Sequence, residues 1–445
     1  RWHGPEKVER FLRGLFGTVK DADPEALVTY VNFPTTEYMN LRFLDFQSFN
    51  VYLEDRPSLE GYLARLHNIA DERPRVMAEI GLDSRRNGEV VQAESLGWQV
   101  RTALRSGCAG AFVYKWTDEW YRGGAEIEDW DFGLTTRDRE PKPALSVVSQ
   151  TFHREPISPS EDWPRISAVV CTYNGSKTIR KTLESLTALE YPDFEVIVVN
   201  DGSTDDTEAI IRDFDVRAIT TENRGLSNAR NTGAEAATGE IVAYIDDDAY
   251  PDPHWMHFLA IGYRSGDWAG MGGPNILPPG STPVAECVSH SPGGATHVLL
   301  SDTEAEHLPG CNLSVRRDRL LEIGGFDPQF NTAGDDVDLC WRLQERGWKI
   351  GYHPGAAVWH HSRDSVRRYW KQQKGYGIAE AKRERKWPEK YNSAGHVSWN
   401  GRLYGPSFFQ NFGWGKPRVY FGYWGSAPFQ ALYHPGRGEV LTLSM

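Results

Sequence analysis

Three consecutive carboxylates stand near the middle of the chain. Residues 240–245 (EIVAYI) have the apolar pattern of a buried strand, and Asp246, Asp247 and Asp248 follow it directly. Neighbouring like charges repel, and moving them out of water is costly unless a cation or hydrogen-bond donors compensate them. The pattern is therefore typical either of a solvated acidic loop or of a cation-binding site at the end of a strand.

A second acidic pair, Asp335 and Asp336, begins a segment with the pattern of an amphipathic helix. The helix dipole favours acidic side chains in a first turn, so a purely structural role for this pair stays open. Two histidines, His360 and His361, follow the apolar residues 356–359. An imidazole suits Mn²⁺ as a ligand, so one of them is a candidate to bind a cation.

The elements around these residues alternate between strands and helices. Residues 166–175 and 194–205 have the pattern of buried strands with polar ends, while residues 176–189 and 225–239 have helical periodicity. A doubly wound α/β domain built in this way binds ligands at the carboxyl ends of its parallel strands. We therefore expect the polar groups at three strand ends to converge on one crevice: Thr172, Tyr173 and Asn174; Asp201; and Asp246, Asp247 and Asp248.

The chain is predicted to divide into four parts. Residues 1–150 hold strand-like segments with helical patterns between them, which indicates a parallel sheet. Residues 151–164 are rich in Pro and Ser and are typical of a linker. Residues 165–395 form the doubly wound domain, and residues 396–445 form an irregular segment rich in Gly, Pro and aromatic residues.

Composition narrows the class of protein. The 445 residues are 40% hydrophobic and 25% charged, with a formal net charge of −12, which argues against electrostatic binding of nucleic acid or anionic lipid. The five cysteines form no CxxC pair and indicate a reducing, cytoplasmic compartment: Cys108, Cys171, Cys287, Cys311 and Cys340.

The sequence contains no apolar run of about 18 residues, the length that marks a membrane span. Both ends look cut, since residues 1–16 begin inside a helical pattern and residues 438–445 stop in an apolar stretch. We therefore expect a position at the inner face of a membrane only through parts of a longer parent protein.

Four segments of the chain, in order, resemble glycosyltransferase family 2 with its GT-A fold. They are residues 168–186, 196–207, 223–248 and 334–348. The likeness covers about residues 165–390. It implies a metal-dependent, inverting glycosyltransferase that moves a sugar from a nucleotide-sugar donor, with a UDP-sugar favoured. The acceptor would be a saccharide or another hydroxyl compound, in glycan or polysaccharide synthesis.

The resemblance assigns the acidic triplet to a cation. A divalent ion, Mn²⁺ or Mg²⁺, would neutralise the charge of the leaving diphosphate. Asp246 and Asp248 match the DxD element of the family, and His360 lies where such enzymes often place a third ligand, with His361 as its competitor. On this hypothesis the solvated-loop alternative is disfavoured.

The resemblance also implies a base and a donor site. Asp336 would be the general base that takes the proton of the acceptor hydroxyl, with Asp335 beside it where family members usually have Glu. A turn role for Asn174 and a surface role for Arg230 are the alternatives. The residues expected to contact the donor are Thr172, Tyr173, Asn174, Asp201, Arg230, Asp246 and Asp247.

A second resemblance covers the first 150 residues. Residues 75–84 (RVMAEIGLDS) and neighbouring segments look like the later half of the barrel of a family 2-like retaining glycoside hydrolase. The likeness makes Glu79 the counterpart of the nucleophile, with Tyr52 and Trp116 near it. A full barrel needs about 250 residues, and the strand that should carry the acid/base carboxylate is missing. We therefore expect a partial (β/α) barrel that is a docking surface or a remnant.

Two alternatives to a transferase stay open. One is a glycoside hydrolase that uses Glu79, and the other is a non-catalytic carbohydrate-binding scaffold, against which intact Asp246, Asp248 and Asp336 argue. The QxxRW-type element of processive synthases is not matched by residues 371–377 (KQQKGYG), which favours addition of a single sugar. The sequence does not determine the donor base, the sugar, the acceptor or the linkage.

Overall fold

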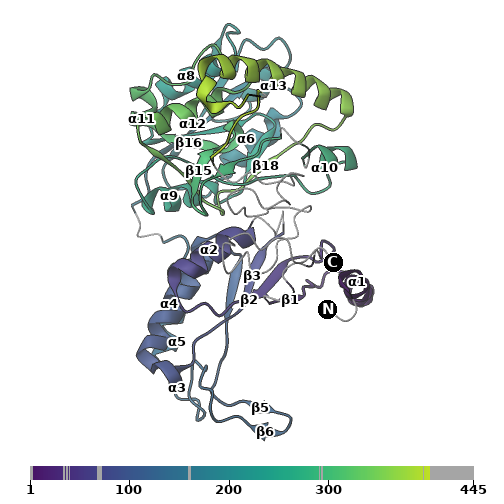
Figure 1. Ribbon diagram of the computed structural model, residues 1–445, viewed down its shortest axis with the longest axis vertical. Helices are drawn as coiled ribbons and strands as arrows, with labels where there is room; N and C mark the ends of the chain where they lie inside the picture. The colour runs from purple at the N-terminus through teal and green to yellow at the C-terminus, as the bar shows by residue number, and fades with distance from the viewer. Residues whose placement is uncertain are drawn as a thin grey trace. The chain divides into compact units, whose positions relative to one another are not determined.

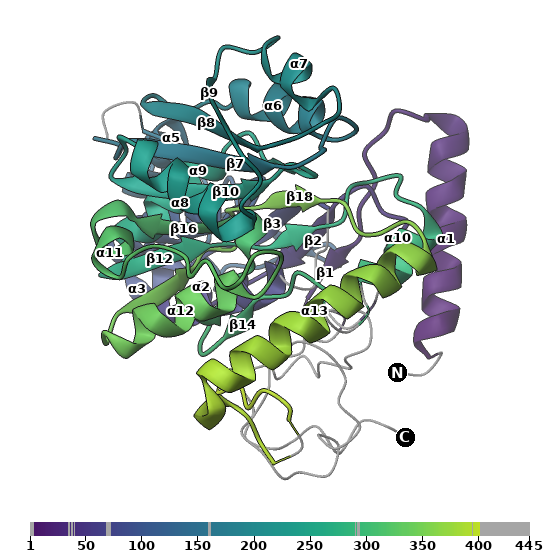
Figure 2. The same ribbon diagram turned by 90° about the horizontal axis from the view of Figure 1, so that it is seen from above.

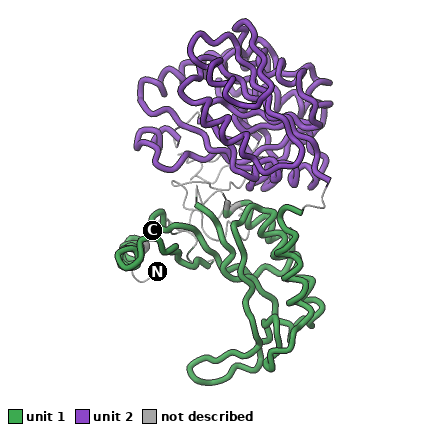
Figure 3. Tube along the Cα trace, turned by 180° about the vertical axis from the view of Figure 1, so that it is seen from behind, with its two compact units in different colours: residues 1–161, 404–445 green, residues 162–403 purple. Residues whose placement is uncertain are grey.

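The computed structural model describes residues 4–33, 36, 39, 41–67, 73–158, 162–289, 291, 294–393 and 395–400. It divides into two compact units, the first with Arg1–Glu161 and the second with Asp162–Leu403 (Figure 3). Of the irregular segment predicted at 396–445, residues from 401 onward lie outside the described residues. In the described part of the chain, no helix is both long and apolar enough to cross a membrane.

The first unit is built on a four-stranded parallel sheet in the order β1-β2-β3-β4. Helices α2, α4 and α5 lie along one side of this sheet (Figure 1). The strands are β1 (Val31–Asn32), β2 (Gln47–Asn50), β3 (Arg75–Ile80) and β4 (Gly110–Val113), and the helices are α1 (Pro5–Ala22), α2 (Arg56–His67), α3 (Ser84–Asn87), α4 (Glu89–Arg105) and α5 (Pro143–Arg154). A short hairpin is formed by β5 (Tyr121–Arg122) and β6 (Ala125–Glu126).

The sheet of the first unit has the parallel order that the alternating pattern predicts. Its strands bury apolar side chains such as Phe49, Met77 and Ile80 against α2 and α4. Among the described residues the sheet is open, with β1 and β4 at its edges, so the partial barrel stays a prediction. Helix α5 continues through residue 154, into the segment predicted as a linker, because Val148 and Thr151 are buried on one of its faces.

The second unit contains a nine-stranded mixed sheet in the order β14-β15-β17-β12-β16-β10-β7-β8-β9. The strands β10, β7, β8 and β9 are parallel neighbours, and β16 joins β10 in the antiparallel sense. The strands are β7 (Ile166–Thr172), β8 (Phe194–Asp201), β9 (Arg217–Thr221), β10 (Ile241–Asp246), β12 (Trp268–Gly272), β14 (Val298–Leu299), β15 (Glu304–His307), β16 (Leu313–Arg316) and β17 (Lys349–Tyr352).

Helices pack on this sheet because its central strands are apolar along nearly their whole length. β7 is buried apart from Cys171 and β10 is buried apart from Asp246, as expected for parallel strands covered on both faces. The helices are α6 (Ile179–Thr187), α7 (Thr207–Ile211), α8 (Leu226–Ala236), α9 (Trp255–Arg264), α10 (Pro283–Ser289), α11 (Arg317–Glu322), α12 (Asp335–Glu345) and α13 (Val366–Lys386).

The strand order changes direction at β7, which has β8 on one side and β10 on the other. Such a switch point leaves a crevice at the carboxyl ends of the strands. The register places Asp246 opposite Cys171 and places Asn200 opposite Thr172, so the polar strand ends lie next to one another. The expected convergence of these groups is therefore built into the sheet.

A small second sheet holds the segment after the acidic triplet in place. Its order is β11 (Ala249–Pro251), β18 (Val358–His360) and β13 (Asn275–Ile276). Ala249 is opposite His360 in the antiparallel pair β11–β18. This pairing brings a histidine from far along the chain beside the carboxylates that end β10.

The long helix α13 runs past α12 (Figures 1 and 2), and a buried carboxylate joins the two. Asp338 of α12 is fully buried. Its oxygens accept hydrogen bonds from Arg342 Nε at 2.8 Å and Trp387 Nε1 at 2.9 Å, and Lys386 Nζ lies 2.6 Å away. Trp341 and Trp387 pack beside this contact. The start of α12, which carries Asp335 and Asp336, is thereby fixed relative to α13.

We predict that Asp338→Ala lowers the free energy of unfolding of the second unit by about 3–5 kcal/mol, because it removes a fully buried carboxylate that pairs with half-buried Arg342 and Lys386 and leaves the buried Trp387 indole without its acceptor. Urea denaturation followed by circular dichroism measures the change. The matched control is Asp364→Ala, which removes an exposed pair with Arg368 and should cost at most about 1 kcal/mol. Equal effects of the two substitutions would contradict the role given to Asp338.

Candidate active site

The three carboxylates of the triplet have different partners. Asp246 Oδ1 accepts a hydrogen bond from Arg230 NH2 at 3.2 Å, and Asp247 Oδ2 accepts one from the Thr172 hydroxyl. Asp248 Oδ2 accepts one from Arg363 NH1 at 2.9 Å. The triplet is therefore not a solvated acidic loop, because each carboxylate accepts a hydrogen bond from a distant part of the chain, and Asp246 and Asp248 are paired with arginines.

These partners set the protonation of the triplet. Burial raises the pKa of Asp247 to about 7, although the Thr172 hydroxyl opposes the shift. Burial also raises the pKa of Asp246, while Arg230 opposes it. Burial would raise the pKa of Asp248 as well, but His360 and Arg363 hold it well below its usual range. Asp248 is therefore an ionised carboxylate at neutral pH.

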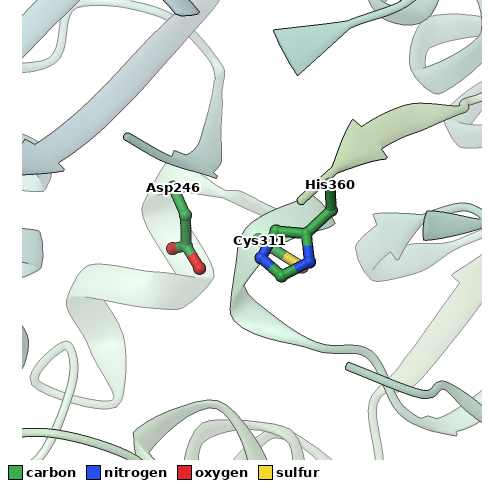
Figure 4. A group of neighbouring side chains, drawn as sticks. All are labelled: Asp246, Cys311 and His360. Carbon is green, nitrogen blue, oxygen red and sulfur yellow. The ribbon is translucent and has the colours of Figure 1, made fainter. Parts of the chain in front are cut away.

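A possible cation site lies at the end of β10 (Figure 4). One ligand atom each from Asp246, Cys311 and His360 lies within 4.8 Å of the others, and His360 Nε2 is 3.4 Å from Asp248 Oδ1. Burial alone would lower the pKa of His360, but Asp248 raises it through a hydrogen bond and its charge. Carboxylate and imidazole ligands suit a divalent ion, so the residues fit the predicted cation, with Cys311 as a donor that the sequence patterns did not indicate.

Arg230 is a buried residue rather than a surface one, with 3% of its area exposed. Its guanidinium spans two carboxylates, with Asp335 Oδ2 at 2.6 Å and Asp246 Oδ1 at 3.2 Å. Burial raises the pKa of Asp335 to about 6 against the effect of Arg230. Gly310 lies against the same guanidinium, where a Cβ would come within 2.4 Å of NH2, so only glycine allows this approach. The structure thus pairs the predicted donor-binding arginine with protein carboxylates.

Asp336 lies at the start of α12 and faces a histidine. Its Oδ2 accepts a hydrogen bond from the Gly310 N–H at 2.9 Å and lies 3.6 Å from His307 Nε2. Burial would raise its pKa, but His307 and the Gly310 amide hold the pKa well below the usual range. Asp336 is therefore ionised at neutral pH, the form in which a carboxylate can accept a proton.

Three residues near these carboxylates were missed by the sequence patterns. Arg363 precedes α13 and His307 ends β15, and neither position carries a local motif. Tyr376 is on α13, and burial together with Asp336, Cys311 and Asp246 raises the pKa of its hydroxyl. These three residues could be found only from the tertiary structure, which brings α13 and the end of β15 close to the carboxylates at the end of β10.

A pocket of about 470 Å³ opens at the carboxyl ends of β7 and β8, and one of its lining residues, Thr172, is hydrogen-bonded to Asp247 of the triplet. Of the predicted donor-contacting residues, Thr172, Tyr173 and Asp201 line it, together with residues 223–226 and 331–332. Both oxygens of Asp201 already accept main-chain hydrogen bonds, from Arg224 N–H at 2.9 Å and Gly225 N–H at 2.8 Å. Asp201 therefore shapes the wall of the pocket, whatever contact it makes with a ligand.

Asn174 is not among the residues that line this pocket. Its φ of 56° is in the left-handed region, where Asn is tolerated better than most residues. The main-chain N–H of Asn174 donates to Ser203 Oγ at 2.9 Å, and the side-chain Oδ1 accepts from the main-chain N–H of Thr204 at 2.8 Å. The turn alternative for Asn174 thus has direct support in these contacts.

Two of the three hydrolase-like residues of the first unit, Tyr52 and Glu79, are in contact. The Tyr52 hydroxyl donates to Glu79 Oε2 at 2.8 Å, and burial together with Glu79 raises the pKa of Tyr52. Trp116 is 60% exposed. The contact orients Glu79, but it supplies no second carboxylate for acid/base chemistry. The vestigial role of this unit stays a prediction.

Comparison with known proteins identifies the class. Residues 167–260 match the family described as Glycosyl transferase family 2, and residues 241–424 match Glycosyl transferase family group 2. The glucosyl-dolichyl phosphate glucuronosyltransferase of Haloferax volcanii is 30% identical over 226 residues, which cover 44% of this chain and 69% of that protein. The chain therefore belongs to glycosyl transferase family 2, as the sequence motifs predicted.

Other relatives match over a smaller share of their length. The pre-mycofactocin glycosyltransferase of Mycobacterium tuberculosis is 31% identical over 272 residues, covering 58% of this chain and 56% of that protein. The poly-beta-1,6-N-acetyl-D-glucosamine synthase of Staphylococcus epidermidis is 29% identical over 247 residues, covering 51% and 57%. The chain thus spans little more than half of these two relatives.

Solved structures show a similar but more distant likeness. The mannosyltransferase PcManGT from Pyrobaculum calidifontis, in complex with GDP-Man and Mn²⁺, is 22% identical with a TM-score of 0.40, and the match covers 51% of this chain and 68% of that one. S. aureus TarS 1-349, in complex with UDP-GlcNAc, is 21% identical with a TM-score of 0.38 and covers 45% and 59%.

We predict that Arg230→Met lowers the free energy of unfolding of the second unit by about 3–5 kcal/mol, because it leaves buried Asp335 without a counter-charge. Denaturant titration measures the loss. Adding Asp335→Asn to Arg230→Met should restore part of it, since the second change removes the uncompensated charge. Arg180→Met, which breaks the exposed pair with Asp213, is the control. Additive losses in the double variant would contradict the pairing.

Proposed function

We propose that the second unit transfers a glycosyl group from a nucleotide-sugar to a hydroxyl of a saccharide acceptor, with inversion and with the help of a divalent cation. The observation that carries this proposal is the turn Gly310–Asn312. It joins the two halves of the chemistry, because the Gly310 amide binds Asp336 while Cys311 adjoins Asp246 and His360. The turn therefore contacts both the proposed proton acceptor, Asp336, and the proposed cation ligands, Asp246 and His360.

The triplet is suited to the leaving diphosphate. Asp246, Asp248 and His360 would hold Mn²⁺ or Mg²⁺, and the bound ion would neutralise charge on the departing diphosphate. Arg363, which pairs with Asp248 in this structure and is 40% exposed at its side chain, is a second positive group within reach. We propose that Arg363 would contact the diphosphate once Asp248 is coordinated to the cation.

Asp336 is the group we assign to the acceptor. Its ionised carboxylate takes the proton from the acceptor hydroxyl, and the oxygen lone pair then forms the new bond to the anomeric carbon. The bond from that carbon to the diphosphate breaks as the new one forms, so a single displacement inverts the configuration. His307, close to the same carboxylate oxygen, stabilises the ionised form before the acceptor arrives.

The pocket at the carboxyl ends of β7 and β8 is the proposed place of the nucleotide. Tyr173 lines this pocket and is 53% exposed, so we propose that its ring stacks on the base. We favour a UDP-sugar as donor and a saccharide as acceptor, in glycan or polysaccharide synthesis. The five free cysteines support a reducing, cytoplasmic setting.

We predict that nucleotide release from a panel of nucleotide-sugars requires Mn²⁺ or Mg²⁺ and is lost in Asp248→Asn, because the variant removes an ionised cation ligand. The panel is measured with and without EDTA and with candidate saccharides. Asp206→Asn, an exposed acid at the start of α7, is the control and should match the wild type. Turnover in EDTA at the rate seen with Mn²⁺ would refute the cation assignment.

We predict that Asp336→Asn lowers the rate of transfer by about 10²–10⁴-fold, the usual contribution of a positioned base. Donor affinity, measured by calorimetry, should change little, because Asp336 acts on the acceptor. Asp318→Asn is the matched control, since Asp318 is an exposed acid in the first turn of α11. A parallel loss of donor binding and of rate would indicate a structural role for Asp336 instead.

A further inference from the structure

We propose that Cys311 is a metal ligand, so that Asp246, Cys311 and His360 bind thiophilic divalent cations such as Zn²⁺ and Cd²⁺ more tightly than Mn²⁺ or Mg²⁺. The proposal rests on the cation site of the proposed function and defines the selectivity of that site. It concerns a donor atom that neither the acidic triplet nor the family match indicates.

The first argument is the position of the thiol. Cys311 is 3% exposed, and its sulfur is within 4.8 Å of a carboxylate oxygen of Asp246 and a ring nitrogen of His360 (Figure 4). Zinc bonds of about 2.3 Å to sulfur and about 2.0 Å to nitrogen place tetrahedral ligands roughly 3.5 Å apart. Side-chain shifts of about 1 Å are therefore enough to close the three donors on one ion.

The second argument is that the main chain on both sides of the thiol is anchored. The neighbouring Asn312 is fully buried, accepts a hydrogen bond from Trp255 Nε1 at 2.9 Å and donates one to the Ala356 carbonyl at 2.8 Å. On the other side, the Gly310 amide is bound to Asp336. The turn is anchored at both flanking residues, so the main chain of Cys311 is fixed beside Asp246 and His360 and only its side chain has to adjust.

The third argument is the chemistry of the donor set. Mn²⁺ and Mg²⁺ prefer oxygen ligands, whereas a thiolate selects zinc and softer ions. When Cys311 coordinates, the S–H bond breaks, the proton leaves to solvent and the sulfur lone pair forms the bond to the ion. Three protein ligands leave one open coordination position on a tetrahedral Zn²⁺ ion. An octahedral Mn²⁺ or Mg²⁺ ion with the same ligands keeps three open positions for a diphosphate. Zn²⁺ should therefore compete with Mn²⁺ and inhibit transfer.

The test is a titration of the full chain with Cd²⁺, followed by the ultraviolet charge-transfer absorption of a sulfur–cadmium bond. We expect one equivalent to saturate the band in the wild type and in Cys171→Ser, the control that removes the thiol opposite Asp246 in the sheet. The band should vanish in Cys311→Ser. The Cd²⁺ affinity of Cys311→Ser should fall by more than the roughly 10–100-fold typical of outer-shell partners. The Mn²⁺ affinity of the same variant, measured by electron paramagnetic resonance, should fall less.

Two results would overturn the proposal: a band that persists in Cys311→Ser, or equal losses of Cd²⁺ and Mn²⁺ affinity, which would indicate a structural role. If Cys311→Ser and Cys311→Ala both fail to fold, X-ray absorption of the wild type with Cd²⁺ decides, since a shell without sulfur refutes ligation. Nucleotide release with Mn²⁺ alone is recorded in parallel. Its absence beside an intact sulfur–cadmium band would refute the transferase proposal and leave the assignment of Cys311 standing.

Discussion

The second unit depends on the compensation of negative charge at one edge of its sheet. Carboxylates crowd there from two directions, since Asp246 ends β10 and Asp335 begins α12, and a buried carboxylate without a counter-charge is costly. Arg230 lies between them and contacts both. Arg363 does the same for Asp248. The positions of β10, α8, α12 and the segment before α13 are thus linked through ion pairs.

The same constraint makes the site ready for a cation. The network neutralises part of the charge, but burial still raises the pKa of Asp246 and brings that of Asp247 to about 7. A nearby positive charge stabilises the ionised form of carboxylates whose pKa is raised by burial. A divalent ion or a cationic side chain can supply that charge. The turn at Gly310 connects the proposed cation site to Asp336, because the Gly310 N–H binds Asp336 while the next residue, Cys311, adjoins Asp246 and His360.

The first unit stands apart from this chemistry. The family matches begin at residue 167, beyond the last residue of that unit's described part. Its parallel sheet presents Glu79 with an orienting hydrogen bond from Tyr52, a contact that fits a vestige as well as a sugar-binding surface. The family assignment therefore rests on residues from 167 onward.

The sequence by itself determined the alternation of strands and helices, the family and the acidic residues of the site, because these depend on local periodicity and on motifs at strand ends. Asp246 and Asp248 became candidate cation ligands in this way, a role that stays a prediction. The tertiary structure decided the partners. Cys311, Arg363 and His307 reach the carboxylates only because distant strands pair at one sheet edge, a long-range arrangement that local patterns do not encode. For the same reason only the fold showed that Arg230, predicted to face a diphosphate, is buried between two carboxylates of the protein.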